Sequence, residues 1–186
     1  PHAIELLVNS FQGDGKCFLT VFAGNPFLHQ KFGVPSHAPV FCVASGPGNM
    51  DFESANPTVV KSIRQRDLLL TWLRLYARDR KLPALTQYRP DRLDEELPDL
   101  VFFTVDTTQR PPRIVINSDG TRMASAYGHR GGGKRLDEYL GPRLAPQVMP
   151  VYYECIRRRL PVFTVDDTDD MYGHIVAYER LLLPFS

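Results

Sequence analysis

Residues 99–106 read Asp-Leu-Val-Phe-Phe-Thr-Val-Asp, and they set the pattern for the second half of the chain. Every second side chain in the middle of this stretch is apolar, and a period of two predicts a β-strand. Arg113–Asn117 predicts a second strand, and Asn117–Gly120 predicts a turn directly after it. Pro161–Val165 and Ile175–Leu183 predict two more strands, so the C-terminal half is expected to contain a sheet.

Helices are predicted before and between these strands. Lys61–Arg80 carries apolar residues at the spacing of one helical face, namely Leu69, Trp72, Leu73 and Tyr76. Tyr88–Leu97 predicts a turn followed by a short helix. Thr121–Tyr127 predicts a short helix, and Arg135–Arg159 predicts a longer one with breaks near Gly141-Pro142 and Pro146.

Residues 1–60 differ in composition from the rest of the chain. They hold only two of the 22 Lys and Arg residues. Cys17–Ala23 and Val40–Ala44 are short apolar runs that predict strands or packed extended segments. Ala3–Val8 is a third short apolar run, for which helix and strand both remain open.

The overall composition is that of a globular protein. Of the 186 residues 43% are hydrophobic and 23% charged, and the net charge is +1. We therefore expect no bulk attraction to nucleic acid or to an anionic membrane. No apolar run approaches the roughly 20 residues of a spanning helix, and no basic region leads into a signal-like apolar run, so no membrane insertion is expected. Three cysteines argue against a disulfide framework, and a cytoplasmic location is the simplest expectation.

Several short motifs, in order, resemble a proteobacterial PAS family over roughly residues 66–186. They are Leu70-Thr71-Trp72-Leu73-Arg74, Leu82-Pro83, Tyr88-Arg89-Pro90, Glu96-Leu97-Pro98-Asp99-Leu100, Gly120-Thr121-Arg122, Tyr127-Gly128, Leu136-Asp137 and Tyr178-Glu179-Arg180-Leu181-Leu182-Leu183-Pro184. The resemblance implies an α+β fold: two strands, a helical crossover, then three strands of one antiparallel sheet. It divides the chain into an unassigned segment (1–60), lead-in helices (61–98) and a PAS-like core (99–186).

The last strand of a PAS sheet has no counterpart before Ser186. An unpaired edge beside a central strand would be a liability. One hypothesis is that an N-terminal segment such as Ala3–Val8 pairs with Ala177–Leu183, in the same chain or from a second one. The alternative is that the last strand is missing or disordered.

The PAS resemblance implies a sensory module in bacterial signal transduction and no catalytic role. Such a module would bind a small ligand, or a protein partner, in an apolar cavity between sheet and crossover helices. The candidate wall residues are Phe103, Val105, Ile114, Ile116, Met123, Tyr127, Met149, Tyr152, Tyr153, Phe163 and Tyr178. The alternative is that these side chains simply fill the core, which leaves a ligand-free interaction module. An enzyme whose site is not readable from the sequence is a third possibility.

In such a module the amphipathic helix Lys61–Arg80 is a candidate for transmission and homodimerisation, since its apolar face needs a partner surface. Its face of Leu69, Trp72, Leu73 and Tyr76 would then meet a partner, and a charge at Trp72 would disrupt the dimer without unfolding the chain. The alternative is that this face packs on the chain's own sheet.

Other chemistry has weaker support in the sequence. Gly128–Arg135 nearly has the spacing of a phosphate-binding loop, but Arg135 stands where a hydroxyl is needed, which favours a plain connector. No cofactor is expected, with haem on His129 as a lesser alternative, and no metal-binding motif occurs. The acidic residues of Asp166–Asp170 predict a solvated loop. Cys155 falls on an apolar helical face and Cys42 between apolar neighbours, so both are expected to be buried, inert thiols.

Overall fold

The computed structural model describes residues 16–23, 55–91, 93–169 and 175–186, and their fold is mixed α and β. Five strands form one antiparallel sheet in the order β3-β2-β1-β5-β4. They are β1 (Lys16–Ala23), β2 (Leu100–Asp106), β3 (Arg113–Asp119), β4 (Val162–Asp169) and β5 (Ile175–Phe185). The predicted strands at these places are therefore confirmed.

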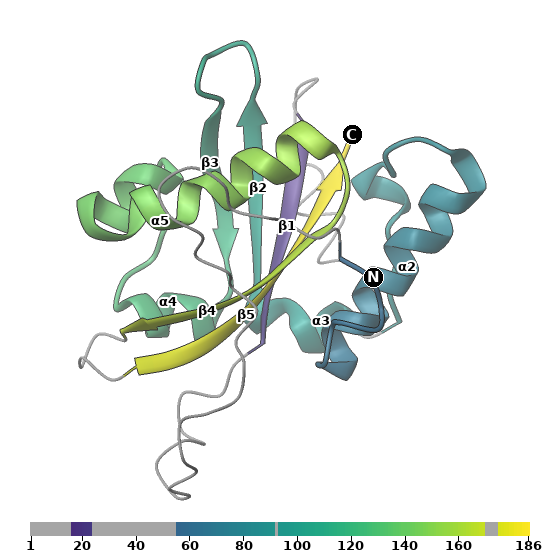
Figure 1. Cartoon of the computed structure of the whole chain (residues 1–186), viewed down its shortest axis with the longest axis horizontal. Coiled ribbons are helices and arrows are strands. Elements are labelled where there is room, and N and C mark those ends of the chain that lie inside the picture. The colour runs from purple at the N-terminus through teal and green to yellow at the C-terminus, as the bar shows by residue number, and fades with distance from the viewer. Residues whose placement is uncertain (1–15, 24–54, 92, 170–174) are drawn as a thin grey trace, which may run out of the picture.

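The N-terminal strand β1 lies in the middle of the sheet, between β2 and β5 (Figure 1). Leu19 is aligned with Phe102 on one side and with Leu183 on the other. β1 thus gives both neighbours the backbone partners that central strands require. The strand at this place is Lys16–Ala23, whereas Ala3–Val8 and Val40–Ala44 lie outside the described residues.

Helices cover both faces of the sheet (Figure 1). One face meets α2 (Ile63–Asp79), α3 (Leu93–Glu96) and the short 3₁₀ turns Leu85–Gln87 and Leu97–Asp99. The other meets α4 (Thr121–Tyr127) and α5 (Leu136–Arg158), which connect β3 to β4. The side chains alternate accordingly: Phe102 packs toward α2, and its neighbour Phe103 packs toward α5.

Helix α2 uses its apolar face inside the chain. Leu69 and Trp72 are fully buried, and Leu73 and Tyr76 pack against the same core. The indole Nε1 of Trp72 donates a hydrogen bond of 2.7 Å to the carbonyl of Pro184 on β5. The alternative that this face packs on the chain's own sheet is therefore correct. A charge at Trp72 would be buried without compensation, so we expect such a substitution to destabilise the fold and not only to break a dimer.

Three boundaries differ from the sequence-based predictions. β3 continues through the expected turn to Asp119, because its residues still pair with β2 across a bulge. α5 breaks at Gly141, which has a φ of 71°, and keeps helical backbone angles through Pro146, which stands in the second turn after that break. The acidic stretch is not wholly a loop, because β4 pairs with β5 as far as Asp169.

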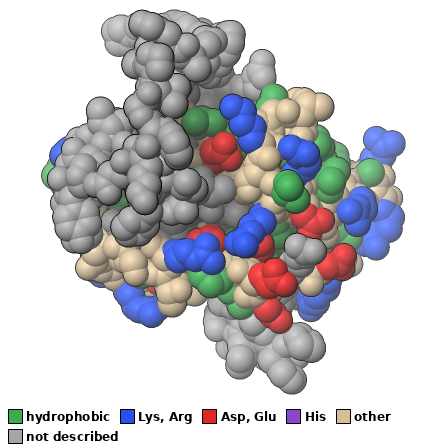
Figure 2. Space-filling model, turned by 90° about the horizontal axis from the view of Figure 1, so that it is seen from below, with side chains coloured by type: hydrophobic (Ala, Val, Ile, Leu, Met, Phe, Trp, Pro, Cys, Tyr) green, Lys and Arg blue, Asp and Glu red, His purple; other side chains and the backbone are tan. Residues whose placement is uncertain are grey.

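The described surface is mixed in charge. Figure 2 shows one face on which Lys and Arg side chains lie among Asp and Glu side chains, in keeping with the net charge of +1. Within the described ranges, no helix combines the length and the apolar character needed to cross a membrane.

Candidate functional site

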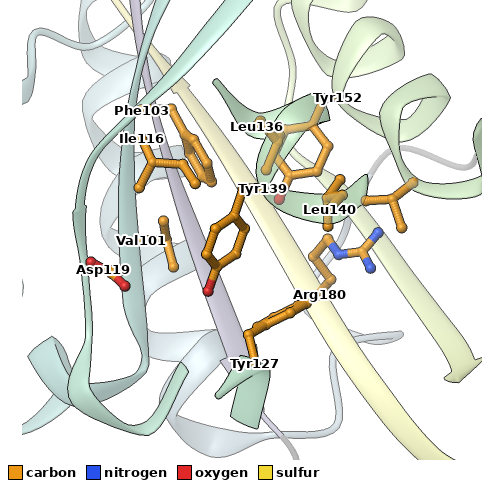
Figure 3. Close-up of a pocket in the computed structure, with 11 residues that line it drawn as sticks. Val101, Phe103, Ile116, Asp119, Tyr127, Leu136, Tyr139, Leu140, Tyr152 and Arg180 are labelled. Atoms are coloured by element: carbon orange, nitrogen blue, oxygen red, sulfur yellow. The ribbon is translucent and has the colours of Figure 1, made fainter. Parts of the chain in front are cut away.

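The candidate site is a small space between the sheet and the helices α4 and α5 (Figure 3). Strands β2, β3 and β5 form its floor, and α5 forms most of its roof. The lining residues are Val101, Phe103, Ile116, Asp119, Tyr127, Leu136, Tyr139, Leu140, Val148, Tyr152 and Arg180. Val101 and Phe103 alternate on β2, whereas Ile116 and Asp119 on β3 are three residues apart because the β2–β3 pairing shifts register between them. Leu136, Tyr139 and Leu140 lie on one side of α5 at i, i+3 and i+4.

Aromatic rings fill much of the space. The ring of Phe103 meets that of Tyr152 edge to face, with 5.4 Å between centroids. The rings of Tyr127 and Tyr139 lie 5.3 Å apart, and the exposed His129 packs on the outer side of Tyr139 at 4.6 Å. Pairs at these distances add favourable contacts beyond simple burial.

The remaining volume is small. The cavity left between these side chains has a volume of about 20 Å³. One water needs about 10–15 Å³ on this measure, and an apolar cavity of about 150 Å³ is known to hold benzene. In this conformation the site therefore has room for about one water and none for an organic ligand.

Three polar groups lie at the edge of this apolar space. The hydroxyl of Tyr139 donates to the carbonyl of His129 at 3.0 Å, and burial raises the pKa of that hydroxyl. A carboxylate oxygen of Asp119 accepts from the backbone N–H of Gly131 at 2.9 Å. Arg180 reaches in from β5 and is only 5% exposed. The hydrogen bonds of Tyr139 and Asp119 hold the loop after α4 against α5 and β3.

The predicted wall residues divide among several places. Phe103, Ile116, Tyr127 and Tyr152 line the space as predicted. Val105 is buried in the same core without lining it, and Phe163 is wrongly predicted, because it packs against the core on the opposite face of the sheet. Ile114, Met149 and Tyr153 instead line a second pocket beside the turn between β2 and β3. The side chains of Met123 and Tyr178 lie outside the described residues.

Sequence reasoning missed the three polar lining residues, and it also missed Leu136 and Leu140 near the start of α5. The spacing of Leu136, Tyr139 and Leu140 was a usable signal, since it repeats at i, i+3 and i+4. Arg180 directly precedes three leucines in a strand, and a charged residue beside a buried apolar run indicates a position where the charge needs polar surroundings. Asp119 offered no signal, because acidic residues at the end of a strand are common.

The glycine-rich loop Gly128–Arg135 runs beside the edge of β3. The N–H of Gly133 donates to the carbonyl of Ile116 at 2.7 Å, and the N–H of Ile116 donates to the carbonyl of Lys134 at 3.0 Å. The N–H of Gly131 is held by Asp119. Two of the N–H groups that a phosphate loop would use therefore have partners within the chain, which supports the connector interpretation.

The thiol and metal expectations concern other parts of the structure. Cys155 is fully buried, its Sγ lies 3.5 Å from the carbonyl of Leu160, and burial raises the pKa of the thiol. Its predicted burial is confirmed, while Cys42 lies outside the described residues. Among the side chains that the structure describes, no group of three His, Cys, Asp or Glu residues is arranged to hold a metal ion.

Comparison of the chain with models of protein families, with curated proteins and with solved structures found no match.

Proposed function

We propose that the chain is a non-catalytic, PAS-like regulatory module that acts through protein contacts, with a core filled by its own side chains. The order of elements supports the PAS-like arrangement: two adjacent strands, a helical crossover on one face, then two further antiparallel strands. β1 occupies the place beside β5 that the resemblance leaves vacant. Among the PAS-like roles, the observation that favours protein contacts over ligand sensing is the cavity of about 20 Å³.

The proposal excludes a ligand held in the core, and native mass spectrometry tests it. Protein purified under native conditions should have the mass of the bare chain or of a whole-number oligomer. A stoichiometric extra mass that disappears on denaturation would contradict the filled core and favour the ligand-sensing alternative.

The protein partner that we propose is a second copy of the chain, bound through the outer face of α2. Ile63, Leu70 and Ala77 lie on this face at intervals of seven residues, which suits helix-to-helix packing. Ile63 is 79% exposed and Leu70 is 36% exposed. This face is different from the one that the sequence alone suggested, because Leu69 and Trp72 are already used in the core.

Sedimentation equilibrium tests this dimer. The unmodified chain should be dimeric at micromolar concentration, and Ile63→Lys should be monomeric with an unchanged melting temperature. Thr86→Lys is the matched control, because it adds the same charge at an exposed residue of the turn Leu85–Gln87. A monomeric unmodified chain, or an Ile63→Lys variant that still dimerises, would reject the proposed face.

A further inference from the structure

A second pocket lies beside the turn that joins β2 and β3. Its volume is about 140 Å³, which is seven times the volume of the cavity in the core. Its walls come from the turn, from the start of β3 and from two parts of α5. The lining residues are Gln109, Arg110, Pro111, Pro112, Arg113, Ile114, Arg135, Asp137, Met149 and Tyr153.

The lining carries more positive than negative charge: three arginines and one carboxylate. Arg135 is held in place by Asp137, with an Nη2 to Oδ2 distance of 2.6 Å and an Nε to Oδ1 distance of 3.1 Å. Arg110 and Arg113 form no ion pair with any carboxylate of the described residues. Hydrogen bonds from Thr108 and, to a smaller extent, attraction to Arg113 lower the pKa of the Asp106 carboxyl, and this attraction offsets part of the charge of Arg113.

Part of the pocket lining is apolar. Ile114 and Met149 are 2% and 7% exposed, and both prolines of the turn contribute ring surface. Tyr153 is half-buried on α5, and burial raises the pKa of its hydroxyl, which therefore remains a hydrogen-bond donor at neutral pH. Apolar side chains in the same lining as two arginines suit an anion with a carbon body better than a fully hydrated inorganic ion.

We propose that this pocket binds a small organic carboxylate, with its charge beside Arg110 and Arg113 and its apolar body against Met149. Arginine recognises a carboxylate through two parallel N–H donors, which gives direction as well as attraction. The volume limits the body to about the size of one benzene ring. The site is separate from the core cavity, so the inference goes beyond the proposed function and does not depend on it.

Titration of the full chain with benzoate, followed by amide NMR shifts or calorimetry at low salt, tests the site. Benzoate should bind saturably, and benzamide, which has the same shape without the charge, should bind at least about tenfold more weakly. The double variant Arg110→Gln/Arg113→Gln should also lose at least about tenfold in affinity for benzoate. The control Arg74→Gln removes an exposed arginine from α2 on the other side of the sheet and should bind as the unmodified chain does.

Several results would overturn the assignment. They are no saturable benzoate binding up to tens of millimolar, equal affinity for benzamide, or unchanged benzoate affinity in the double variant with an unchanged melting temperature. Binding of inorganic phosphate without binding of benzoate would also overturn it. None of these results bears on the mass measurement that tests the filled core.

Discussion

Replacing Phe103 by alanine probes the filled core directly. Phe103 is 1% exposed, it lines the candidate site, and its ring packs edge to face with that of Tyr152, with 5.4 Å between centroids. Removal of such a ring costs about 3–5 kcal/mol in the free energy of unfolding, because transfer energy is lost and a cavity is left. Loss of the aromatic pair accounts for about 0.5–1.5 kcal/mol of this cost. A domain of ordinary stability, about 5–15 kcal/mol, should survive the change in a weakened form.

Urea denaturation measures this cost, and benzene reports on the cavity. Ile116→Val, which removes one methylene group from the same space, is the control and should cost about 0.5–1.5 kcal/mol. Saturating benzene should raise the urea midpoint of Phe103→Ala and leave that of the unmodified chain unchanged. A loss below about 1 kcal/mol for Phe103→Ala would refute the close packing, which predicts several times that amount. Equal stabilisation of both proteins by benzene would refute the filled core.

Two further predictions concern stability. Gly120→Ala should destabilise the chain by at least about 1–3 kcal/mol in urea denaturation, because the new Cβ would lie 2.2 Å from the carbonyl oxygen of Pro98. Gly132→Ala is the control, since the nearest atom to its Cβ would be 3.7 Å away. Equal losses of stability in the two variants would contradict this packing. The Glu96 side chain is 5% exposed, and burial raises its pKa although Arg64 opposes the shift. A raised folded pKa means that the native state holds the proton more tightly, so this contribution to stability is complete below the unfolded pKa of about 4.3 and is lost as the pH rises through the folded value. The gain in free energy of unfolding that Glu96→Gln produces should therefore be larger at pH 7 than at pH 4, as urea titrations of both proteins at both pH values would measure. A loss of stability in the variant at pH 7 would show that attraction between Glu96 and Arg64 outweighs the cost of burial.

Local pattern was enough to predict most of the elements. The alternation in residues 99–106 and the helical spacing in 61–80 are set by neighbours along the chain, and both elements are present as β2 and α2. The extent of β3 was underestimated, because Asn117–Gly120 has the composition of a turn while pairing with β2 keeps most of it extended. Here a long-range partner overrode a local preference.

The arrangement of the site was less accessible from the sequence. The sequence predicts a strand at Cys17–Ala23, but its place between β2 and β5 depends on residues more than 75 positions away in the chain. The two faces of α2 are both partly apolar, and only burial distinguishes Trp72, which is in the core, from Ile63, which is exposed. Asp119 and Arg180 are brought to one cavity by the sheet, and no local spacing relates them.

The central place of β1 carries the PAS-like interpretation, and cross-strand nuclear Overhauser effects test it most directly. Thr20 is aligned with Val101 on β2 and with Leu182 on β5. In a uniformly labelled sample, the backbone protons of residues 16–23 should show cross-strand effects to both β2 and β5. Effects that join β2 directly to β5, or none from residues 16–23 to either strand, would contradict the sheet order and the function proposed from it.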